Sequence, residues 1–397
     1  MENVYVVSGV RTAIGKFGGT LKDVLPEELA RIVIEGAIEK AGIDKSAIDE
    51  VIFGQTKQSA DAPNIARVAA LMAKLPEEMP AYTVHRQCGS GLTALIAGAT
   101  QIKAGESDIV VVGGVESMSG AQYYLRNARY GYKVGNAELV DPNTESQPKS
   151  QPEDVYGHLI MGMTAENLAE KFSITREEQD AFALQSQQRA CAAITSGRFK
   201  DEIVPVVIPQ RKKDPIVFDT DEFPRFDTSA EKLAKLKPAF KKDGTVTAGN
   251  ASGRNDGASA LVLASEKAVK KYGLKPLARY VSYAAAGVDP RIMGYGPVPA
   301  MRKALEKAGL TLADMDLIEI NEAFAAQTLA CVKELGIDQS KLNVNGGAIA
   351  LGHPLGMSGA RISVTLVHEM LKRGSKYGIA AICIAGGQGA AAIFERV

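Results

Sequence analysis

Tryptophan is absent from this chain, and cysteine and histidine occur only four times each among its 397 residues. The cysteines form no C-x-x-C pair, which excludes a disulfide-rich scaffold. No run of 18 apolar residues occurs, so no transmembrane helix is expected. The first eight residues lack the basic and apolar regions of a signal peptide. We therefore expect a cytoplasmic protein whose thiols are reduced.

An excess of charge of one sign is also lacking, because Lys+Arg and Asp+Glu both number 46. A neutral chain favours neither nucleic acid nor an anionic membrane as its main partner. No closely spaced set of histidine, cysteine and carboxylate residues suggests a metal site, so we expect none. Glycine, in contrast, is abundant, with 39 residues that predict many tight turns.

The chain contains a repeat. Residues 37–43 (AIEKAGI) match residues 304–310 (ALEKAGL) by identity or by exchange of one aliphatic side chain for another. The same offset of 267 (304 − 37) pairs Val51 with Ile318 in the apolar run that follows each copy. Each copy predicts a helix that ends at glycine, a short polar loop and a buried strand. Such a repeat indicates a duplicated domain.

Buried strands that alternate with helices predict an α/β fold. We expect two similar α/β halves around a pseudo-twofold axis, with amphipathic helices over about 90–104 and 358–373. The predicted division is a first half of residues 1–118 and 249–272, an inserted domain of residues 119–248, and a second half of residues 273–397. The insertion is predicted to carry a strong helix from Thr175 to about Ser196. It is either a lid or binding surface or a solvent-exposed excursion.

Two cysteines stand where apolar runs give way to glycine-rich turns. Cys88 lies in HRQCGSG, before the helix predicted from Gly89 or Ser90. A helix N-terminus favours a thiolate, and a backbone N–H there can hold an oxyanion. Cys88 is thus a candidate nucleophile, or else an inert buried cysteine. Cys383 lies in ICIAGGQG, where a thiol could move a proton on and off carbon.

Two further polar residues occupy comparable positions in the second half. His353 follows Gly352 and precedes Pro354, so the ring is displayed on a constrained turn. It suits a general base, although a lone histidine in a turn is more often structural. Asn321 ends the second copy of the repeated strand, where it could hold a water or an oxyanion or simply cap the next helix. The polar run 246–257 could bind an extended ligand or form tight turns.

These blocks resemble the thiolase family, the acyl-CoA C-acyltransferases, along essentially the whole chain. The matching blocks are Cys88-Gly89-Ser90-Gly91, Gly113 to Ser119, Thr164-Ala165-Glu166-Asn167, residues 246–257, Asn321-Glu322-Ala323-Phe324, residues 345–359 and Cys383 to Gly389. The resemblance implies a fold of duplicated αβαβα halves. It also implies an acyltransferase of fatty acid metabolism that forms or cleaves 3-ketoacyl-CoA, with acetyl-CoA acetyltransferase activity favoured over long-chain activity.

The resemblance further implies the role of each residue. Cys88 becomes acylated, and His353 activates it and, with a water held by Asn321, polarises the thioester of the second substrate. Cys383 exchanges the proton at the α-carbon, and the backbone N–H groups of Cys88 and Ala385 form an oxyanion site. Ligand contacts are implied for Arg225 and Ser252 toward CoA and for Met161, Met293 and Phe324 around the acyl group. Coenzyme A is substrate and product, and no separate cofactor is implied.

Three positions depart from the pattern of the family: His85 stands where asparagine is common, Ile160 where short-chain members carry histidine, and Lys232 where some relatives have serine. Two other functions remain open. One is a condensing enzyme of the ketoacyl synthase type, which Cys383 disfavours. The other is a non-catalytic protein that binds acyl-CoA or lipid. By resemblance, the expected assembly is a homotetramer or a homodimer.

Overall fold

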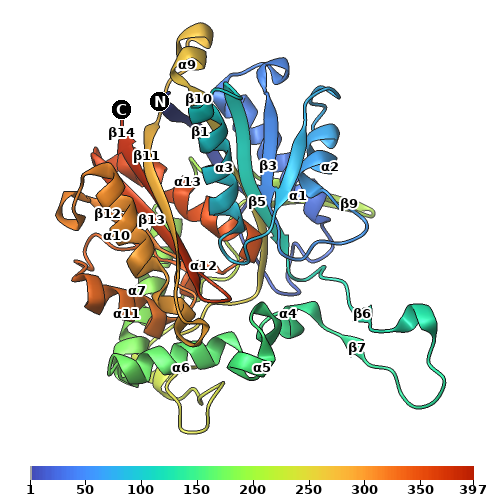
Figure 1. Ribbon diagram of the computed structural model, residues 1–397, viewed down its shortest axis with the longest axis vertical. Coiled ribbons are helices and arrows are strands. Elements are labelled where there is room, and N and C mark those ends of the chain that lie inside the picture. Colours follow the sequence, from blue (N-terminus) through green and yellow to red (C-terminus); the bar gives the residue numbers. More distant parts are fainter. Residues whose placement is uncertain (1) are drawn as a thin grey trace.

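The protein is described by a computed structural model that covers residues 2–397 (Figure 1). The first half consists of β1 (Val4–Arg11), β2 (Gly15–Lys16), α1 (Pro26–Ala41), β3 (Glu50–Gly54), α2 (Ile65–Met72), β4 (Ala81–Val84), α3 (Ser90–Ala104), β5 (Ile109–Ser117), β10 (Asn255–Ser265) and α9 (Glu266–Tyr272). The second half consists of β11 (Ala278–Gly287), α10 (Pro297–Ala308), β12 (Leu317–Ile320), α11 (Ala325–Leu335), α12 (Ala348–Leu351), α13 (Leu355–Arg373), β13 (Tyr377–Ile384) and β14 (Gln388–Arg396).

The two halves repeat the same order of elements, as the sequence repeat predicts. The main sheet runs β12-β13-β14-β11-β1-β10-β5-β3-β4, with β2 attached to β10. The halves meet where β1 and β11 pair antiparallel, with Val4 opposite Tyr280 and Val6 opposite Ala278. Helices α1 and α10 both end at a left-handed glycine, Gly42 or Gly309. The predicted duplication around a pseudo-twofold axis is confirmed.

The apolar residues of the strands face helices on both sides of the sheet, so the two halves together form five layers. Alternate residues of the first-half strands pack outward against α1 and α2, and those of the second half pack outward against α10 and α11. The inward-facing residues of both halves enclose α3 and α13, which form the central layer (Figure 1). These two helices approach closely, because a Cβ on Gly91 would lie 2.7 Å from the carbonyl oxygen of Gly356. They begin at residues 90 and 355 and so fix the turns that precede them.

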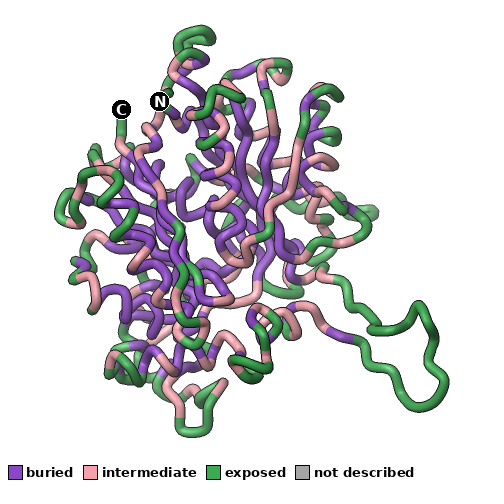
Figure 2. The backbone as a smooth tube through the Cα atoms, in the orientation of Figure 1, coloured by how far each residue is buried: buried purple, intermediate pink, exposed green. Residues whose placement is uncertain are grey.

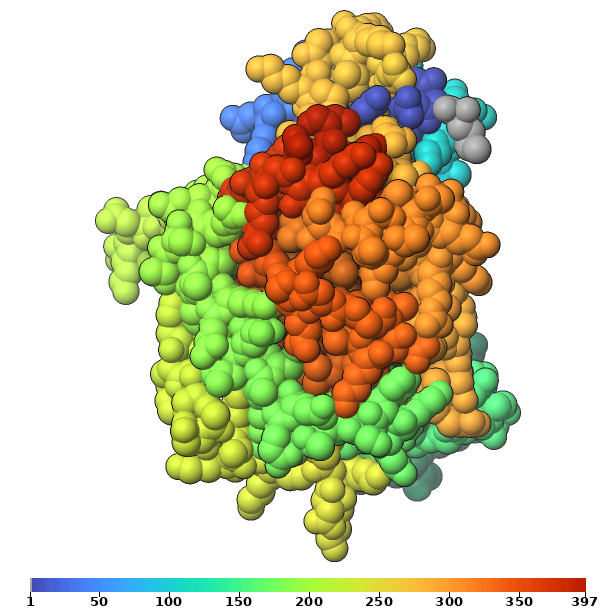
Figure 3. Space-filling model, turned by 90° about the vertical axis from the view of Figure 1, so that its left-hand side faces the viewer, coloured from blue at the N-terminus to red at the C-terminus, as the bar shows by residue number. Residues whose placement is uncertain are grey.

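The insertion consists of β6 (Tyr124–Leu125), β7 (Leu139–Val140), α4 (Pro142–Glu145), α5 (Glu153–Tyr156), α6 (Met161–Lys171), α7 (Arg176–Thr195), β8 (Val206–Gln210), β9 (Lys213–Phe218) and α8 (Ala230–Ala234). Its β6–β7 hairpin projects from the body and is exposed (Figure 2). Helices α6, α7 and α8 wrap the side and lower end of the second half (Figure 3), whereas β8 and β9 pack against the outer core of the first half through Val206 and Phe218. Helix α7 has the predicted Thr175–Glu178 capping box.

Buried ion pairs fasten the insertion to the first half. The Arg11 guanidinium at the end of β1 contacts Glu202 at 2.6 Å and Asp221 at 2.7 Å, and all three side chains are buried. Because two carboxylates surround one guanidinium, the charges are compensated away from water. Over residues 2–397, no helix has both the length and the apolar content needed to cross a bilayer. Within the same range, no group of three or more metal-ligating side chains comes together.

Candidate active site

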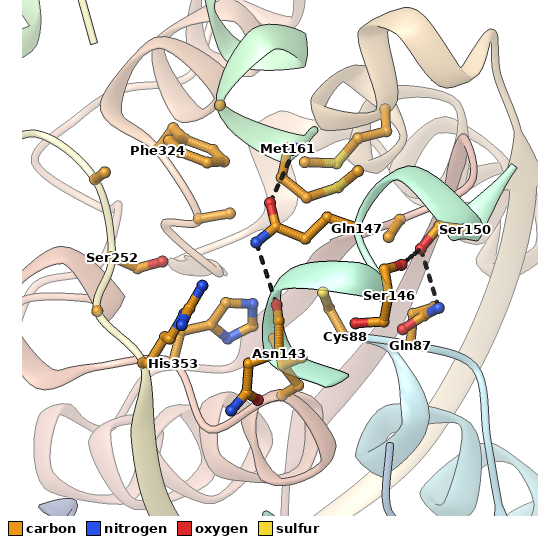
Figure 4. A pocket seen from close by; sticks show the side chains of 18 of the residues that line it. Gln87, Cys88, Asn143, Ser146, Gln147, Ser150, Met161, Ser252, Phe324 and His353 are labelled. Carbon is orange, nitrogen blue, oxygen red and sulfur yellow. Dashed lines mark hydrogen bonds between the residues drawn. The ribbon is translucent and has the colours of Figure 1, made fainter. Parts of the chain in front are cut away.

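A pocket of about 240 Å³ lies where the two halves and the insertion meet (Figure 4). Cys88 comes from the first half, His353 and Ala385 from the second, and Met161 from helix α6 of the insertion. The other lining residues are Gln87, Met118, Asn143, Ser146, Gln147, Ser150, Gly162, Phe240, Ala251, Ser252, Gly253, Arg254, Met293, Ala323, Phe324 and Leu355. Residues remote in sequence thus converge on one cavity.

The turn that carries Cys88 is held rigidly. Gln87 adopts a left-handed backbone with φ of 44°, which costs energy for a residue other than glycine. The Ser90 hydroxyl donates to the Gln87 carbonyl at 2.7 Å and accepts from the Arg86 N–H at 2.8 Å. These bonds fix the sulphur at the N-terminal end of α3. The helix predicted from Gly89 or Ser90 begins at Ser90.

The Cys88 sulphur is a thiol in this structure rather than the thiolate that a helix N-terminus favours. It keeps some contact with solvent, but burial raises the pKa of Cys88 to about 11. Hydrogen bonds from the backbone N–H groups of Ala385 and Cys88 lower the pKa, as does the charge of Lys57, but they do not offset burial. A base or a substrate contact must therefore shift the proton before Cys88 can attack a thioester.

His353 occupies the turn equivalent to that of Cys88, since each lies two residues before a central helix. Its Nδ1 is 2.6 Å from the Ser358 hydroxyl, which itself donates to the Pro354 carbonyl at 2.8 Å. Because that hydroxyl's only proton is used, Ser358 accepts from Nδ1–H, and Nε2 is left with its lone pair. Burial, followed by the charge of Arg361, lowers the pKa of His353 to about 3. The ring is a neutral base at physiological pH.

Asn321 and Cys383 lie just behind the pocket wall. The Asn321 amide nitrogen is 3.5 Å from both ring nitrogens of His353, and its carbonyl oxygen is buried without a protein partner in residues 2–397. Cys383 is fully buried at the end of β13, two residues before Ala385. Burial raises the pKa of Cys383 well above its ordinary value, and the nearby thiols of Cys88 and Cys331 raise it further. A protonated thiol therefore stands next to Cys88.

The predicted ligand residues divide into two groups. Ser252, Met161, Met293 and Phe324 line the pocket. Arg225 is absent from the lining: its backbone N–H donates to Gln187 at 2.9 Å, and its guanidinium lies over the ring of Phe223. Its contact with a ligand remains a prediction.

The residues that depart from the family pattern lie outside this lining. His85 is exposed, Ile160 caps the start of α6, and Lys232 forms an exposed ion pair with Asp227.

Sequence reasoning missed one wall of the pocket. Gln87, Asn143, Ser146, Gln147 and Ser150 form a polar side of the pocket, on which Gln147 also accepts a hydrogen bond from the Met161 N–H at 3.3 Å (Figure 4). Hydrogen bonds join them: the Gln87 amide donates to the Ser150 hydroxyl at 3.1 Å and the Gln147 amide to the Asn143 carbonyl at 3.3 Å. The only signal in the sequence was the polar, proline-containing run 141–148. Nothing in that run indicated that it would face Cys88.

The arrangement has the parts needed for acyl transfer. It contains a thiol, a neutral imidazole whose Nε2 has a lone pair, two backbone N–H groups that lower the pKa of the thiol, and a second buried thiol whose pKa the first one raises. The imidazole can take a proton, and the N–H groups can bind a developing oxyanion. One pocket wall is apolar enough to hold an acyl or pantetheine chain.

Comparisons with known proteins agree along the whole chain. Residues 4–267 match the family model of the thiolase N-terminal domain, and residues 274–396 match that of the thiolase C-terminal domain. The chain is 54% identical over 396 residues to acetyl-CoA acetyltransferase of Pseudomonas aeruginosa. The aligned region covers 100% of both chains.

Solved structures match equally well. The chain is similar to Bacillus anthracis acetyl-CoA acetyltransferase, with 52% identity, a TM-score of 0.97 and coverage of 100% and 99% of the two chains. It is also similar to human mitochondrial 3-ketoacyl-CoA thiolase in complex with CoA, with 49% identity, a TM-score of 0.95 and coverage of 100% and 98%.

Proposed function

The chain belongs to the thiolase family, and on that premise we propose that it is an acetyl-CoA acetyltransferase. It catalyses the reversible Claisen condensation of an acyl-CoA with acetyl-CoA and, in reverse, the thiolytic cleavage of a 3-ketoacyl-CoA. The observation that carries this proposal is the convergence of Cys88, His353 and the Ala385 N–H on one pocket, in a chain about half identical to named acetyl-CoA acetyltransferases over its full length.

In the first half-reaction, we propose that Nε2 of His353 takes the proton of Cys88 as the thioester enters. The thiolate attacks the thioester carbon, and the C–S bond to CoA breaks. The departing CoA sulphur takes the proton back from His353, which leaves acyl-Cys88 and free CoA. The backbone N–H groups of Cys88 and Ala385, which lower the pKa of the Cys88 thiol, would bind the oxyanion of the tetrahedral intermediate.

In the second half-reaction, Cys383 is the proposed acid and base at carbon. During condensation its thiolate takes a proton from the α-carbon of acetyl-CoA, and the resulting carbanion attacks the acyl carbon of acyl-Cys88. The C–S bond to Cys88 breaks, the 3-ketoacyl-CoA is released, and the Cys88 thiolate takes up the proton held by Cys383. During cleavage Cys383 gives that proton back. Its raised pKa keeps it protonated at rest, which is the form required for cleavage. Asn321 and His353, whose side chains are in contact, would polarise the oxygen of the second thioester.

Coenzyme A is the proposed ligand of the pocket, supported by the similarity to the human thiolase in complex with CoA. Ser252 and the apolar residues Met161, Met293 and Phe324 would contact the pantetheine and acyl groups, and Arg225 the nucleotide. Residues 119–248 act in this proposal as a separate inserted domain that supplies binding surface. A cytoplasmic location, a place in β-oxidation and an assembly of two or four copies are predictions from the resemblance.

Steady-state kinetics test the function. Thiolysis of 3-ketoacyl-CoA substrates of increasing chain length should give the highest kcat/KM with acetoacetyl-CoA, because the cavity is small. Variants at Ile160 and His85 should show whether the departures from the family pattern set the preference. A condensing enzyme of the ketoacyl synthase type would show no thiolysis, and a non-catalytic carrier would bind CoA without turnover. Either result would overturn the proposal.

A further inference from the structure

A lysine lies directly behind the polar wall of the pocket. Lys57 follows strand β3, and its backbone N–H donates to the buried carboxylate of Glu116 at 2.9 Å, which fixes the start of the side chain. Its ammonium nitrogen then donates to the Ser146 hydroxyl at 2.6 Å and to the Pro142 carbonyl at 3.1 Å. Ser146 lines the cavity that contains Cys88. The cation is thus one side chain away from the reaction space.

The charge of Lys57 is not cancelled by a direct partner. Both of its hydrogen-bond acceptors are neutral, and across residues 2–397 no carboxylate comes within ion-pair distance of its nitrogen. An ammonium group has three donors, so one N–H of Lys57 stays available. Burial lowers the pKa of Lys57, whereas the charges of Glu116, Cys88 and Asp141 raise it and that of Arg254 lowers it. The positive charge of Lys57 is therefore not neutralised by a partner and interacts electrostatically with the neighbouring groups.

The group on which the positive charge of Lys57 matters for the chemistry is the Cys88 sulphur. Among residues 2–397, the groups that lower the pKa of Cys88 are the backbone N–H groups of Ala385 and Cys88 and the positive charge of Lys57. The charged and titratable groups around the sulphur are Lys57, Glu116, His353, Cys383 and Arg254, which lines the same cavity and lies 3.6 Å from Asp141. Of these, Glu116 disfavours a negative sulphur, His353 is neutral at rest, and Cys383 is protonated. A cation beside a partly buried thiolate compensates for part of its lost hydration.

We propose that Lys57 is a positioning residue of the active site, whose ammonium group stabilises the Cys88 thiolate electrostatically and holds the Ser146 wall against the pocket. The proposal rests on the proposed function in that Cys88 is the nucleophile. Lys57 acts when His353 removes the thiol proton, because a thiolate then appears in a partly dry cavity. The positive charge of Lys57 favours proton transfer from Cys88 to His353, and Lys57 does this without contacting the substrate.

Alkylation of Cys88 by iodoacetamide tests the electrostatic role, because the rate follows the thiolate fraction and needs no acyl-CoA. The full-length protein is treated between pH 6 and pH 10, and the Cys88 peptide is quantified by mass spectrometry to separate it from the other three cysteines. In the Lys57→Met variant, the pH dependence of the alkylation rate should shift upward by about one pH unit. At a fixed pH below the midpoint, the alkylation rate of Cys88 should fall about tenfold. Lys57→Arg, which keeps the charge, should restore most of that rate.

Two matched controls separate charge from scaffolding. Ser146→Ala removes the tether but keeps the cation and should leave the alkylation profile in place. Lys149→Met removes an exposed lysine from the same wall, which bonds Glu153 instead, and should also leave it in place. If Lys57→Met does not fold, Lys57→Gln takes its place.

The proposal is overturned if the uncharged Lys57 variant alkylates with the wild-type pH dependence, or if Lys149→Met shifts the profile equally. Absence of thiolysis in the wild type would instead contradict the proposed function and leave the alkylation profile unchanged.

Discussion

Acidification should lower the free energy of unfolding of this protein, because His353 is buried in its neutral form. The imidazole has a pKa of about 3 in the folded chain and 6.5 as a model group, so the unfolded state binds the proton more readily. Stability is therefore intact above pH 6.5 and is lost as pH falls from 6.5 toward 3. Between pH 7 and pH 5 the loss is about 2 kcal/mol, because 1.5 pH units below 6.5 correspond to about 1.4 kcal/mol each.

His353→Asn isolates this contribution, since the variant keeps every other titratable group. Urea unfolding followed by circular dichroism at pH 7 and pH 5 gives the loss for each protein. The wild type should lose about 2 kcal/mol more than the variant over that interval. Equal losses in the two proteins would show that the imidazole is not held neutral, and the assignment of Nε2 as a free base would fail with it. The chain has only four histidines, so an NMR titration of the rings can check the same point directly.

Other variants address single steps of the proposed reaction. Cys88→Ser should abolish the acyl-enzyme seen by mass spectrometry, and an adduct on another residue would refute the assignment. Cys383→Ser should keep acylation of Cys88 but lose exchange of the acetyl-CoA α-protons; exchange at the wild-type rate would remove Cys383 from that role. Ser358→Ala should lower kcat about tenfold at unchanged KM, because one hydrogen bond that selects the His353 tautomer is lost while the pocket lining stays intact. A change in KM alone would contradict this. Light scattering should give the mass of a dimer or tetramer, and a monomer would contradict the expected assembly.

The duplicated architecture could be predicted because its signals are local or repeated. Gly42 and Gly309 end equivalent helices, Thr175 and Glu178 form a capping box, and α3 begins where the residues after Cys88 indicate. The convergence of Cys88 and His353 followed from the repeat, because equivalent turns meet at the axis between halves. Periodicity and turn chemistry are sufficient for inferences of this kind.

The electrostatics of the site could not be predicted in this way. Sequence favoured a thiolate at Cys88 because a helix begins there, but burial outweighs the helix terminus and raises the pKa of Cys88. Whether the pKa of Cys88 rises or falls depends on how many atoms surround the sulphur. No local sequence pattern encodes that number. Ser358 was missed although it lies in the block that contains His353, because its hydroxyl reaches the ring only through the helical turn that follows. Lys57 was missed because it acts through a contact with Ser146, 89 residues away.

The order of strands in the first half bears on how the protein is made. Strand β10 lies between β1 and β5, yet it is synthesised after the entire insertion, 138 residues (255 − 117) beyond the end of β5. At translation rates of about 5–20 residues per second, β5 waits roughly 7 to 28 seconds for β10, and β1 waits longer still. Their unpaired edges are open to wrong partners throughout that time. The first half can therefore complete its sheet only after the insertion has been made, whereas strands β13 and β14 of the second half are neighbours in sequence and pair directly as a hairpin.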